Sequence, residues 1–275
     1  RITSGKLTLE PGAITWSIAL AQRFRPYGAL VGNAVTFDSA QRVVVQGGRE
    51  DRLLAPTLLV RDNGETFLLY TAELDGVRHI HMRQGVDGPL GPLPDFFAVV
   101  VADPDESFDD PSVIEHAGRV LVLLRHTFPN EVRQLELWRS PRGSVSTLRD
   151  LEPAPGSNLG SLTRVTGPMS AQEQRRAPHL SVRGGTYRVH FERRTGTRSV
   201  IELLVGDELR AFRSLGEVLA PRTGAQDSVG VGSPSALQTA DGVERLYYMG
   251  RDGLVDRLFV TEREGVLDPG SLRGR

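Results

Sequence analysis

One acidic residue stands directly before a proline that opens an apolar run, Asp110 in the segment Asp110-Pro111-Ser112-Val113-Ile114. A carboxyl group can protonate a leaving group, attack an electrophilic carbon or activate water. Three similar segments carry a small residue without a carboxyl group at the same place: Ala55, Ala177 and Ser233. We therefore predict that Asp110 is a catalytic carboxylate and that any second catalytic group comes from elsewhere in the chain.

Further charged residues stand where the second apolar run of each segment ends. Glu73 and Glu192 are candidates for the second carboxylate. Candidate ligand-binding residues at the same ends are Arg125, His126, Arg193 and Arg251. Guanidinium forks match carboxylates and phosphates in geometry, so this set favours an anionic or highly hydroxylated small ligand. The alternative for each residue is a solvated strand end whose charge pairs with a neighbour.

Four more positions complete the candidate set. Asp38 becomes a candidate base if the N-terminal region supplies the first structural unit. His179 follows the third proline of the pattern and could donate a hydrogen bond to a ligand, contact a central ion or water, or fill space. Arg176 and Ser233 stand just before the third and fourth prolines, and we assign them to ligand binding.

These candidates are positioned by a repeat. The prolines at 56, 111, 178 and 234 are separated by 55, 67 and 56 residues, and each is followed by an apolar run, a turn and a second run. The turns contain glycine, which supplies the positive φ of tight hairpins. The second runs, rich in strand formers, are 66–70, 120–124, 186–191 and 245–249, and the third runs are 78–82, 134–138, 200–204 and 256–260. Each repeat is therefore predicted to be an antiparallel β-meander.

A series of meanders at this period predicts an all-β fold, a five-bladed β-propeller of four-stranded antiparallel blades in one domain over residues 1–275. The repeat units begin near 55, 110, 177 and 233. We expect the fifth blade to come from the N-terminal region, including 34–37 and 42–46, and to be closed by the C-terminal strand. The innermost strands of a propeller converge at one mouth, so the four residues before the prolines should face a common pocket.

Composition excludes several function classes. The 33 basic and 34 acidic residues give a net charge of −1, which argues against binding to nucleic acid or to an anionic membrane. The absence of cysteine excludes disulfides, thiolate catalysis and thiolate zinc sites. His79 and His81 lie on one face of an expected strand without a nearby third ligand, so we expect a polar outer face, no metal and no cofactor. Compartment and oligomeric state stay open.

The Asp110-Pro111 opening, the segment Ala177-Pro178-His179-Leu180 and the spacing of the four meanders resemble the five-bladed β-propeller glycoside hydrolases. That superfamily includes arabinanases, β-xylosidases, invertase and levansucrase, together with the related mannoside phosphorylases, and the similarity covers about residues 27 to 262. The resemblance implies three carboxylates from successive blades: a nucleophile or base, an assisting Asp and a general acid Glu. The assisting Asp falls on Asp110, the first position on Ala55 and the acid on Arg176 or Ala177, so two of the three carboxylates are absent.

Three functions follow as hypotheses. The first is a carbohydrate-active enzyme that resembles glycoside hydrolases and acts on a small glycoside or sugar-derived substrate in the axial funnel. The alternatives are a repurposed non-hydrolytic enzyme that performs acid–base chemistry on a small metabolite, and a non-catalytic ligand-binding propeller. Aromatic residues make up 6% of the chain, with Trp16 and Trp138 as the two tryptophans, which favours a small ligand over a stacked polysaccharide.

Overall fold

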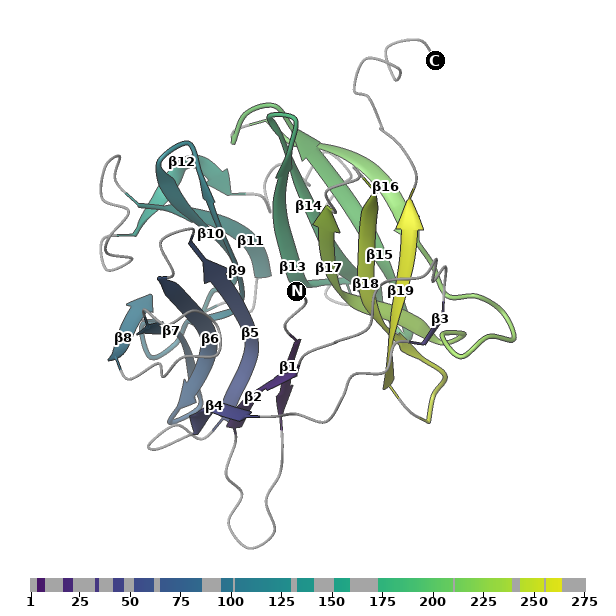
Figure 1. The fold of residues 1–275 in the computed structure, drawn as a ribbon, viewed down its shortest axis with the longest axis horizontal. Helices are drawn as coiled ribbons and strands as arrows, with labels where there is room; N and C mark the ends of the chain where they lie inside the picture. Colours follow the sequence, from purple (N-terminus) through teal and green to yellow (C-terminus); the bar gives the residue numbers. More distant parts are fainter. Residues whose placement is uncertain are drawn as a thin grey trace, which may run out of the picture.

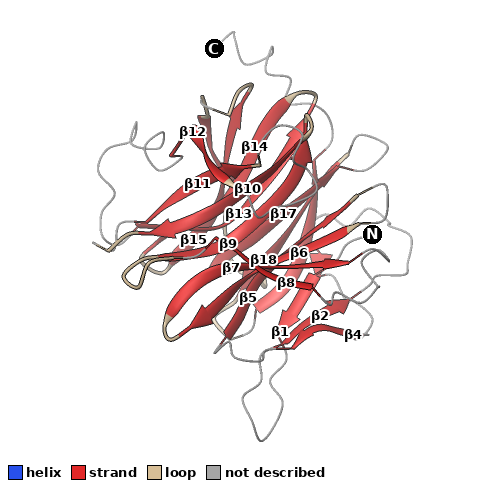
Figure 2. Ribbon diagram, turned by 90° about the vertical axis from the view of Figure 1, so that its left-hand side faces the viewer, coloured by secondary structure: helices blue, strands red, loops and turns tan. Residues whose placement is uncertain are grey.

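A computed structural model describes the chain in separate stretches that together contain strands, turns and connections but no helix. Figure 2 shows the strands as red arrows in several sheets. The expected all-β class is confirmed. The described residues are 4–7, 17–21, 33–34, 42–46, 52–61, 65–85, 95–100, 102–129, 133–140, 151–158, 173–209, 211–238, 243–254 and 256–263.

Three four-stranded antiparallel meanders follow one another along the chain, called here the first, second and third sheets; the third is part of a larger eight-stranded sheet. The first contains β5 (Arg52–Val60), β6 (Thr66–Leu74), β7 (Val77–Gly85) and β8 (Asp95–Val100). The second contains β9 (Ser107–His116), β10 (Arg119–Thr127), β11 (Arg133–Arg139) and β12 (Glu152–Asn158). The third contains β13 (Glu173–Arg183), β14 (Thr186–Thr195), β15 (Arg198–Gly206) and β16 (Arg213–Leu219).

The remaining strands come from both ends of the described chain. β17 (Gly230–Gln238), β18 (Glu244–Arg251) and β19 (Asp256–Arg263) form the fourth meander, and β3 (Asn33–Ala34) pairs with β19. One parallel pairing, Ser199 with Gly230, joins this group to the third sheet. A three-stranded sheet contains β1 (Ser4–Leu7), β2 (Ser17–Ala21) and β4 (Arg42–Gln46).

This arrangement differs from the expected N-terminal blade in its pairing. We expected residues 34–37 and 42–46 in one blade closed by the C-terminal strand. The structure pairs Ala34 with Phe259 of β19, whereas 42–46 form β4 and pair with β2. The sequence shows strand-forming runs but carries no local signal for which distant strand each run will join, so the two runs could not be assigned to different sheets.

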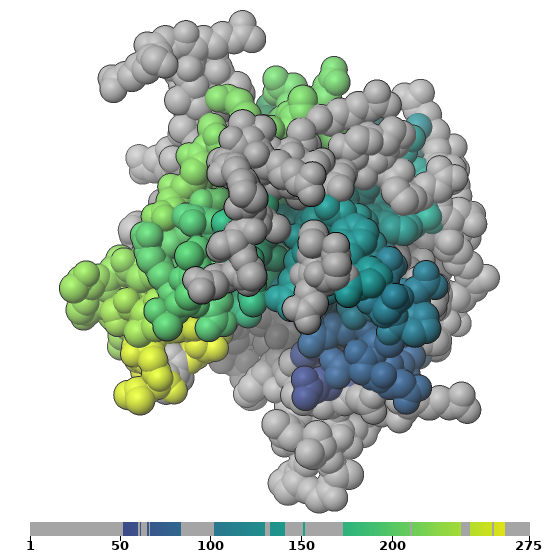
Figure 3. All heavy atoms as spheres, turned by 180° about the vertical axis from the view of Figure 1, so that it is seen from behind, coloured from purple at the N-terminus to yellow at the C-terminus, as the bar shows by residue number. Residues whose placement is uncertain are grey.

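The first strands of successive meanders lie beside one another. β9 contacts β5 on one side and β13 on the other, and β13 also contacts β17. Figure 1 shows these four strands nearest the centre of the molecule, with the later strands of each meander farther out. On the face seen in Figure 3, the atoms of successive parts of the chain lie next to one another, from blue through teal and green to yellow. The strand starts carrying Ala55, Asp110, Ala177 and Ser233 are thereby brought to neighbouring positions.

Each of these four residues lies in a β-bulge with a left-handed backbone. The φ angles are 46° at Ala55, 54° at Asp110, 47° at Ala177 and 49° at Ser233, and the pairing of each first strand with the second shifts register there. Bulges bend a strand and redirect side chains. The left-handed region is disfavoured for residues with a Cβ. Its occurrence at the same place in all four meanders indicates that the surrounding sheets hold the backbone in this conformation.

The apolar core lies between neighbouring sheets. One cluster joins the first and second sheets through Phe67, Leu69 and Val122. Another joins the second and third through Leu123, Val189 and Phe191. These side chains are fully buried because both faces of each middle strand are covered, which explains the nearly continuous apolar runs seen in the sequence. The packing fixes the strand ends from which the polar side chains project.

Candidate functional site

Asp110 lies at the junction of three sheets. Its carboxyl Oδ2 accepts a hydrogen bond of 2.9 Å from the backbone N–H of Ala177, at the bulge of the third sheet. Its own backbone N–H donates to the hydroxyl of Thr71, on β6 of the first sheet, at 3.1 Å. The side chain keeps 19% of its surface accessible. Asp110 therefore presents a carboxyl group that is anchored from both neighbouring sheets and is still open to a ligand.

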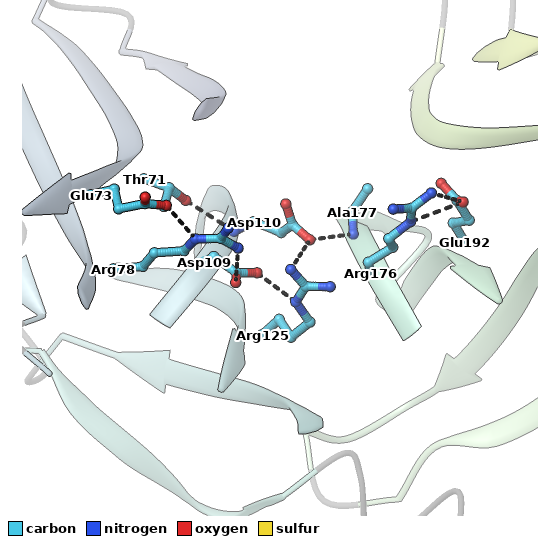
Figure 4. Close-up of polar contacts among 9 residues, drawn as sticks. All are labelled: Thr71, Glu73, Arg78, Asp109, Asp110, Arg125, Arg176, Ala177 and Glu192. Atoms are coloured by element: carbon cyan, nitrogen blue, oxygen red, sulfur yellow. Dashed lines mark hydrogen bonds and ion pairs between the residues drawn. The ribbon is translucent and has the colours of Figure 1, made fainter. Parts of the chain in front are cut away.

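The adjacent Asp109 serves a different role. Its carboxylate is paired with Arg125 of β10 at 2.5 Å and with Arg78 of β7 at 3.2 Å, and its side chain is only 5% accessible. Arg78 in turn reaches Glu73 at 3.0 Å, and Arg125 reaches Asp110 at 3.5 Å. Figure 4 shows this alternation of acidic and basic side chains from Glu73 to Asp110. Asp109 holds Arg125 beside Asp110 and is itself shielded from a ligand.

A second ion cluster occupies the next two sheets. Glu192 of β14, with 1% of its side chain accessible, accepts hydrogen bonds of 2.9 and 2.6 Å from Nε and Nη2 of Arg176. Arg251 of β18 approaches the same carboxylate at 3.4 Å. Gly232, the residue before the bulge of β17, lies so close that an added Cβ would stand 2.0 Å from Oε2 of Glu192. Any larger residue at this position would require the Glu192 carboxylate to move.

Burial raises the pKa of Asp110, because a desolvated carboxylate is disfavoured. The positive charge of Arg125 opposes this rise, the negative charge of Asp109 adds to it, and the Ala177 N–H and the charge of Arg176 lower the pKa again. Burial also opposes the charge on Arg125, but Asp110 and Asp109 outweigh it and raise the pKa of Arg125 above its ordinary value. Asp110 can therefore carry a proton at a higher pH than an ordinary aspartate, next to a cation that stays charged.

The strand period separates the candidate residues into two groups. Arg125 and Glu192 face the cluster around the bulges, whereas the next residue along each strand points to the opposite face. His126 packs against Phe108 and Phe128 and lies 3.1 Å from Glu136. Arg193 pairs with Glu202 at 2.6 Å and with Glu217 at 3.2 Å, on the outer strands of its sheet. The structure does not bring these two residues to Asp110.

The other candidates fall in distinct places. Glu73 is tied to Arg78, and Ser233 is exposed at its bulge. His179 lies between the third and fourth meanders, and its Nε2 is 2.9 Å from the carbonyl oxygen of Ala236. Burial lowers the pKa of His179 to about 4, although the bond to that carbonyl opposes the shift, so a neutral ring donates through Nε2–H. Asp38 lies outside the described residues.

Sequence reasoning missed Thr71, Arg78, Asp109 and Gly232. The doublet Asp109-Asp110 could have indicated Asp109, because the residue before a bulge lies directly opposite a residue of the second strand and can form an ion pair with it. Asp109 is opposite Arg125, and Arg176 is opposite Glu192 in the same register. Arg78 gave no such signal, since its contact with Asp109 crosses from one sheet to the next.

The residues described contain no group of three or more His, Asp or Glu side chains placed to hold a metal ion. His79 and His81 stack with ring centroids 6.2 Å apart, and Nδ1 of His79 accepts a hydrogen bond from the backbone of Ala102. Within the same described parts of the chain, no helix is long and apolar enough to span a membrane.

Comparison with solved structures identifies the class of fold. A thermostable family-43 glycoside hydrolase matches with a TM-score of 0.64 at 14% identity, over 96% of this chain and 92% of its own. An α-L-arabinanase of Cellvibrio cellulosa, solved with arabinohexaose, matches with a TM-score of 0.54 at 16% identity, over 93% and 90%. A family-32 β-fructofuranosidase of Bombyx mori matches with a TM-score of 0.58 at 16% identity, over 90% and 57%.

These neighbours are β-propeller glycoside hydrolases, and the chain has their fold. No protein-family model matches the sequence, and no curated protein matches it. Identities near 15% establish the scaffold alone, and fold does not fix activity. Any activity of this chain depends on the residues around Asp110.

Proposed function

We propose that the protein is a carbohydrate-active enzyme that binds a small glycoside or sugar-derived substrate beside Asp110, with this carboxyl group as its proton donor or acceptor. The proposal is supported by the glycoside hydrolase fold of its structural neighbours, one of which was solved with arabinohexaose bound. The observation that carries it is the state of Asp110. Its carboxyl group is desolvated enough to have a raised pKa, is oriented by the Ala177 N–H, and remains 19% accessible.

The scaffold we propose is a five-bladed propeller over residues 1–275, in which four blades have four strands and the described part of the fifth has three. Four blades are the meanders that begin near 55, 110, 177 and 233, with β3 as the outer strand of the last. The three-stranded sheet of β1, β2 and β4 supplies the fifth, and its β1 contacts β5 of the first meander. Asp110 would then lie at the axial mouth, where propeller enzymes bind their ligands.

Hydrolysis of a glycosidic bond requires a second carboxyl group, either about 5 Å away in a retaining enzyme or farther away in an inverting one. Asp109 and Glu192 are almost completely buried and each is paired with two arginines. Glu73 is tied to Arg78, although 15% of its side chain is accessible. We propose Asp38 as the hydrolytic partner of Asp110, with Glu73 as the alternative, and we give Glu192 the role of holding arginines.

A non-hydrolytic reaction is the second candidate, and the identity of Arg176 favours it. The resemblance to glycoside hydrolases implies a general acid at this place, whereas Arg176 is held by Glu192 at 2.6 Å and stays charged. One accessible carboxyl group beside fixed guanidinium groups can move a proton on a small metabolite while the cations stabilise developing negative charge. Such a reaction needs no second carboxyl group.

Substitution of Asp110 tests both candidates. The wild type, Asp110→Asn and Asp38→Asn should be assayed on small aryl glycosides and on free sugars, with Glu115→Gln as a control. Glu115 lies on the same strand, and its carboxylate is bound to Arg61 with 34% of its surface accessible. Asp110→Asn should lower activity at least 100-fold, the range that general acid–base groups supply, and Glu115→Gln should not change it.

The outcomes separate the two functions. Loss of glycoside cleavage in both Asp110→Asn and Asp38→Asn would support hydrolysis by this pair. Binding of sugars to the wild type without cleavage of any glycoside would support the non-hydrolytic reaction. Full activity of Asp110→Asn would contradict the role of Asp110 in either function.

A further inference from the structure

Arg176 and Arg251 share a single buried carboxylate. They reach Glu192 from different meanders, Arg176 from β13 of the third and Arg251 from β18 of the fourth. Their side chains keep 25% and 26% of their surface accessible, whereas Glu192 keeps 1%. The carboxylate is therefore covered, and the two guanidinium groups form the accessible part of the cluster.

Glu192 is fixed in this covered position. Oε1 accepts both hydrogen bonds from Arg176, and Oε2 lies against the backbone of Gly232, where an added Cβ would be only 2.0 Å away. Three guanidinium hydrogen bonds to Oε1 and the close packing of Oε2 against Gly232 hold this carboxylate in its covered position. Glu192 is accordingly a positioning residue that sets the direction of the two arginines.

The cluster has one more positive than negative charge. Glu192 neutralises one of the two guanidinium groups, and Nη1 of Arg176 meets no acceptor among the described residues. Arg251 also approaches Asp256 at 3.4 Å, but that side chain is 58% accessible and its interaction is weakened by water. A bound anion with a single negative charge would neutralise the remaining positive charge.

Asp110 stands next to this cationic group. Arg176 directly precedes Ala177, whose N–H binds the carboxyl group of Asp110 at 2.9 Å. Figure 4 shows Asp110 and the Arg176 side chain on the two sides of Ala177. A ligand that contacts Arg176 therefore lies within the neighbourhood of the proposed proton donor.

We propose that Arg176 and Arg251 bind the carboxylate of a sugar acid and so place its ring beside Asp110. The inference rests on the proposed function, because it assumes that a sugar-derived substrate binds at this edge. Guanidinium groups bind carboxylate and phosphate alike. A monoanion fits better, since Arg176 and Arg251 carry one positive charge more than Glu192 neutralises.

The test compares sugars that differ only in the carboxylate. D-galacturonate and D-glucuronate are titrated into the protein by calorimetry beside D-galactose and D-glucose at fixed ionic strength, with acetate and inorganic phosphate as sugar-free anions. The same series is run on Arg176→Gln, whose amide can still donate to Glu192. Arg198→Gln is the matched control, because Arg198 is 60% accessible and pairs with Glu217 on the outer strands.

At least one uronate should bind the wild type tenfold or more tightly than its neutral counterpart. Arg176→Gln should abolish that preference and leave the neutral sugar as before, and Arg198→Gln should change neither. If Arg176→Gln does not fold, as judged by circular dichroism, Arg251→Gln takes its place with the same expected loss of preference.

Three outcomes would overturn the proposal. Equal affinity for uronates and neutral sugars would show that the arginines do not recognise the carboxylate. The protein would still bind a sugar, so the proposed function would stand. Binding of acetate or phosphate as tight as that of a uronate would show an anion site without a role for the sugar. Binding of neither class would contradict both this inference and the proposed function.

Discussion

The second and third sheets have the same local backbone and opposite charges. In both, the residue before the bulge pairs directly with a residue of the next strand. The pair is Asp109 with Arg125 in the second sheet and Arg176 with Glu192 in the third. The bulge geometry thus fixes where a charged pair can form, but leaves its polarity to the sequence.

Reversal of polarity changes what each sheet offers to a ligand. In the second sheet the buried acid Asp109 holds an arginine beside the accessible carboxyl group of Asp110. In the third sheet the acid is Glu192, on the second strand, β14. Arg176 is followed at the bulge by Ala177, which contributes its backbone N–H. In the function we propose, the second sheet supplies the proton-transferring group, and the third supplies cations and a hydrogen-bond donor. The same bulge can therefore carry either polarity of ion pair without a change of fold.

The largest effect on stability is expected from Arg125→Gln, compared with Glu192→Gln at the equivalent position. Arg125→Gln leaves the buried Asp109 paired with Arg78 alone, and breaking a buried ion pair costs about 3–5 kcal/mol. Glu192→Gln leaves Arg176 and Arg251, which keep 25% and 26% of their surface accessible, so its cost should be smaller. Arg125→Gln should also raise the pKa of Asp110 further, because Asp110 loses its nearest cation. Glu192→Gln should lower that pKa or leave it unchanged, since Arg176 loses its counter-charge. Urea unfolding and the pH dependence of activity measure the two effects.

The comparison fails if the two variants shift the pH dependence in the same direction. Arg61→Gln is a suitable control, because Arg61 forms ion pairs with Glu65 and Glu115 away from the bulges. It should leave the pH dependence unchanged.

A smaller loss is expected from Gly232→Ala. The new methyl group would meet Oε2 of Glu192 at 2.0 Å, so the Glu192 carboxylate, which Arg176 holds through Oε1, would have to shift. Overpacking of this kind costs about 1–3 kcal/mol. The shorter side chain of Glu192→Asp should relieve the clash. The double variant should therefore lose less free energy of unfolding than the two single variants lose together. Strict additivity in this double-mutant cycle would contradict the contact.

The repeat and its strands were predictable because their signals are local. The turn residues Ala117 and Gly118 do adopt successive positive φ angles of 51° and 71°, as a tight hairpin requires. The expected run 120–124 lies inside β10 at Arg119–Thr127. Apolar alternation, proline and glycine were sufficient for this part of the fold.

The site was predicted only in part, for two physical reasons. The first is strand parity, since neighbouring residues of a strand face opposite sides and Arg125 and His126 could not both reach the same ligand. The second is that the decisive contacts cross between sheets, as from Ala177 to Asp110 over 67 positions. The left-handed backbone before each proline was also unexpected, because proline normally favours an extended conformation in the preceding residue.

A loss of about 1–2 kcal/mol is expected from Thr71→Val. The hydroxyl of this buried residue accepts the backbone N–H of Asp110 at 3.1 Å, and valine keeps the shape but leaves that donor unsatisfied. Thr71→Ser retains the acceptor and should recover activity, even if its smaller side chain packs less well. If Thr71→Val were as active and as stable as Thr71→Ser, the hydroxyl would have no part in positioning Asp110.

The smallest effect is expected in the pH dependence of stability, where Asp110→Asn is compared with the wild type. The pKa of Asp110 is raised in the folded protein by burial, so the folded state binds its proton more tightly than the unfolded chain does. The wild type therefore gains from this group at a pH below the unfolded value of about 3.9, and loses that gain as the pH rises through the folded pKa. Asparagine can still accept the Ala177 N–H through its amide oxygen and never ionises. The Tm of Asp110→Asn relative to the wild type should consequently increase from acid toward neutral pH and then level off. A difference that instead decreases with pH would mean that Arg125 and the Ala177 N–H stabilise the carboxylate more than burial opposes it, and Asp110 would then be a fixed anion like Asp109.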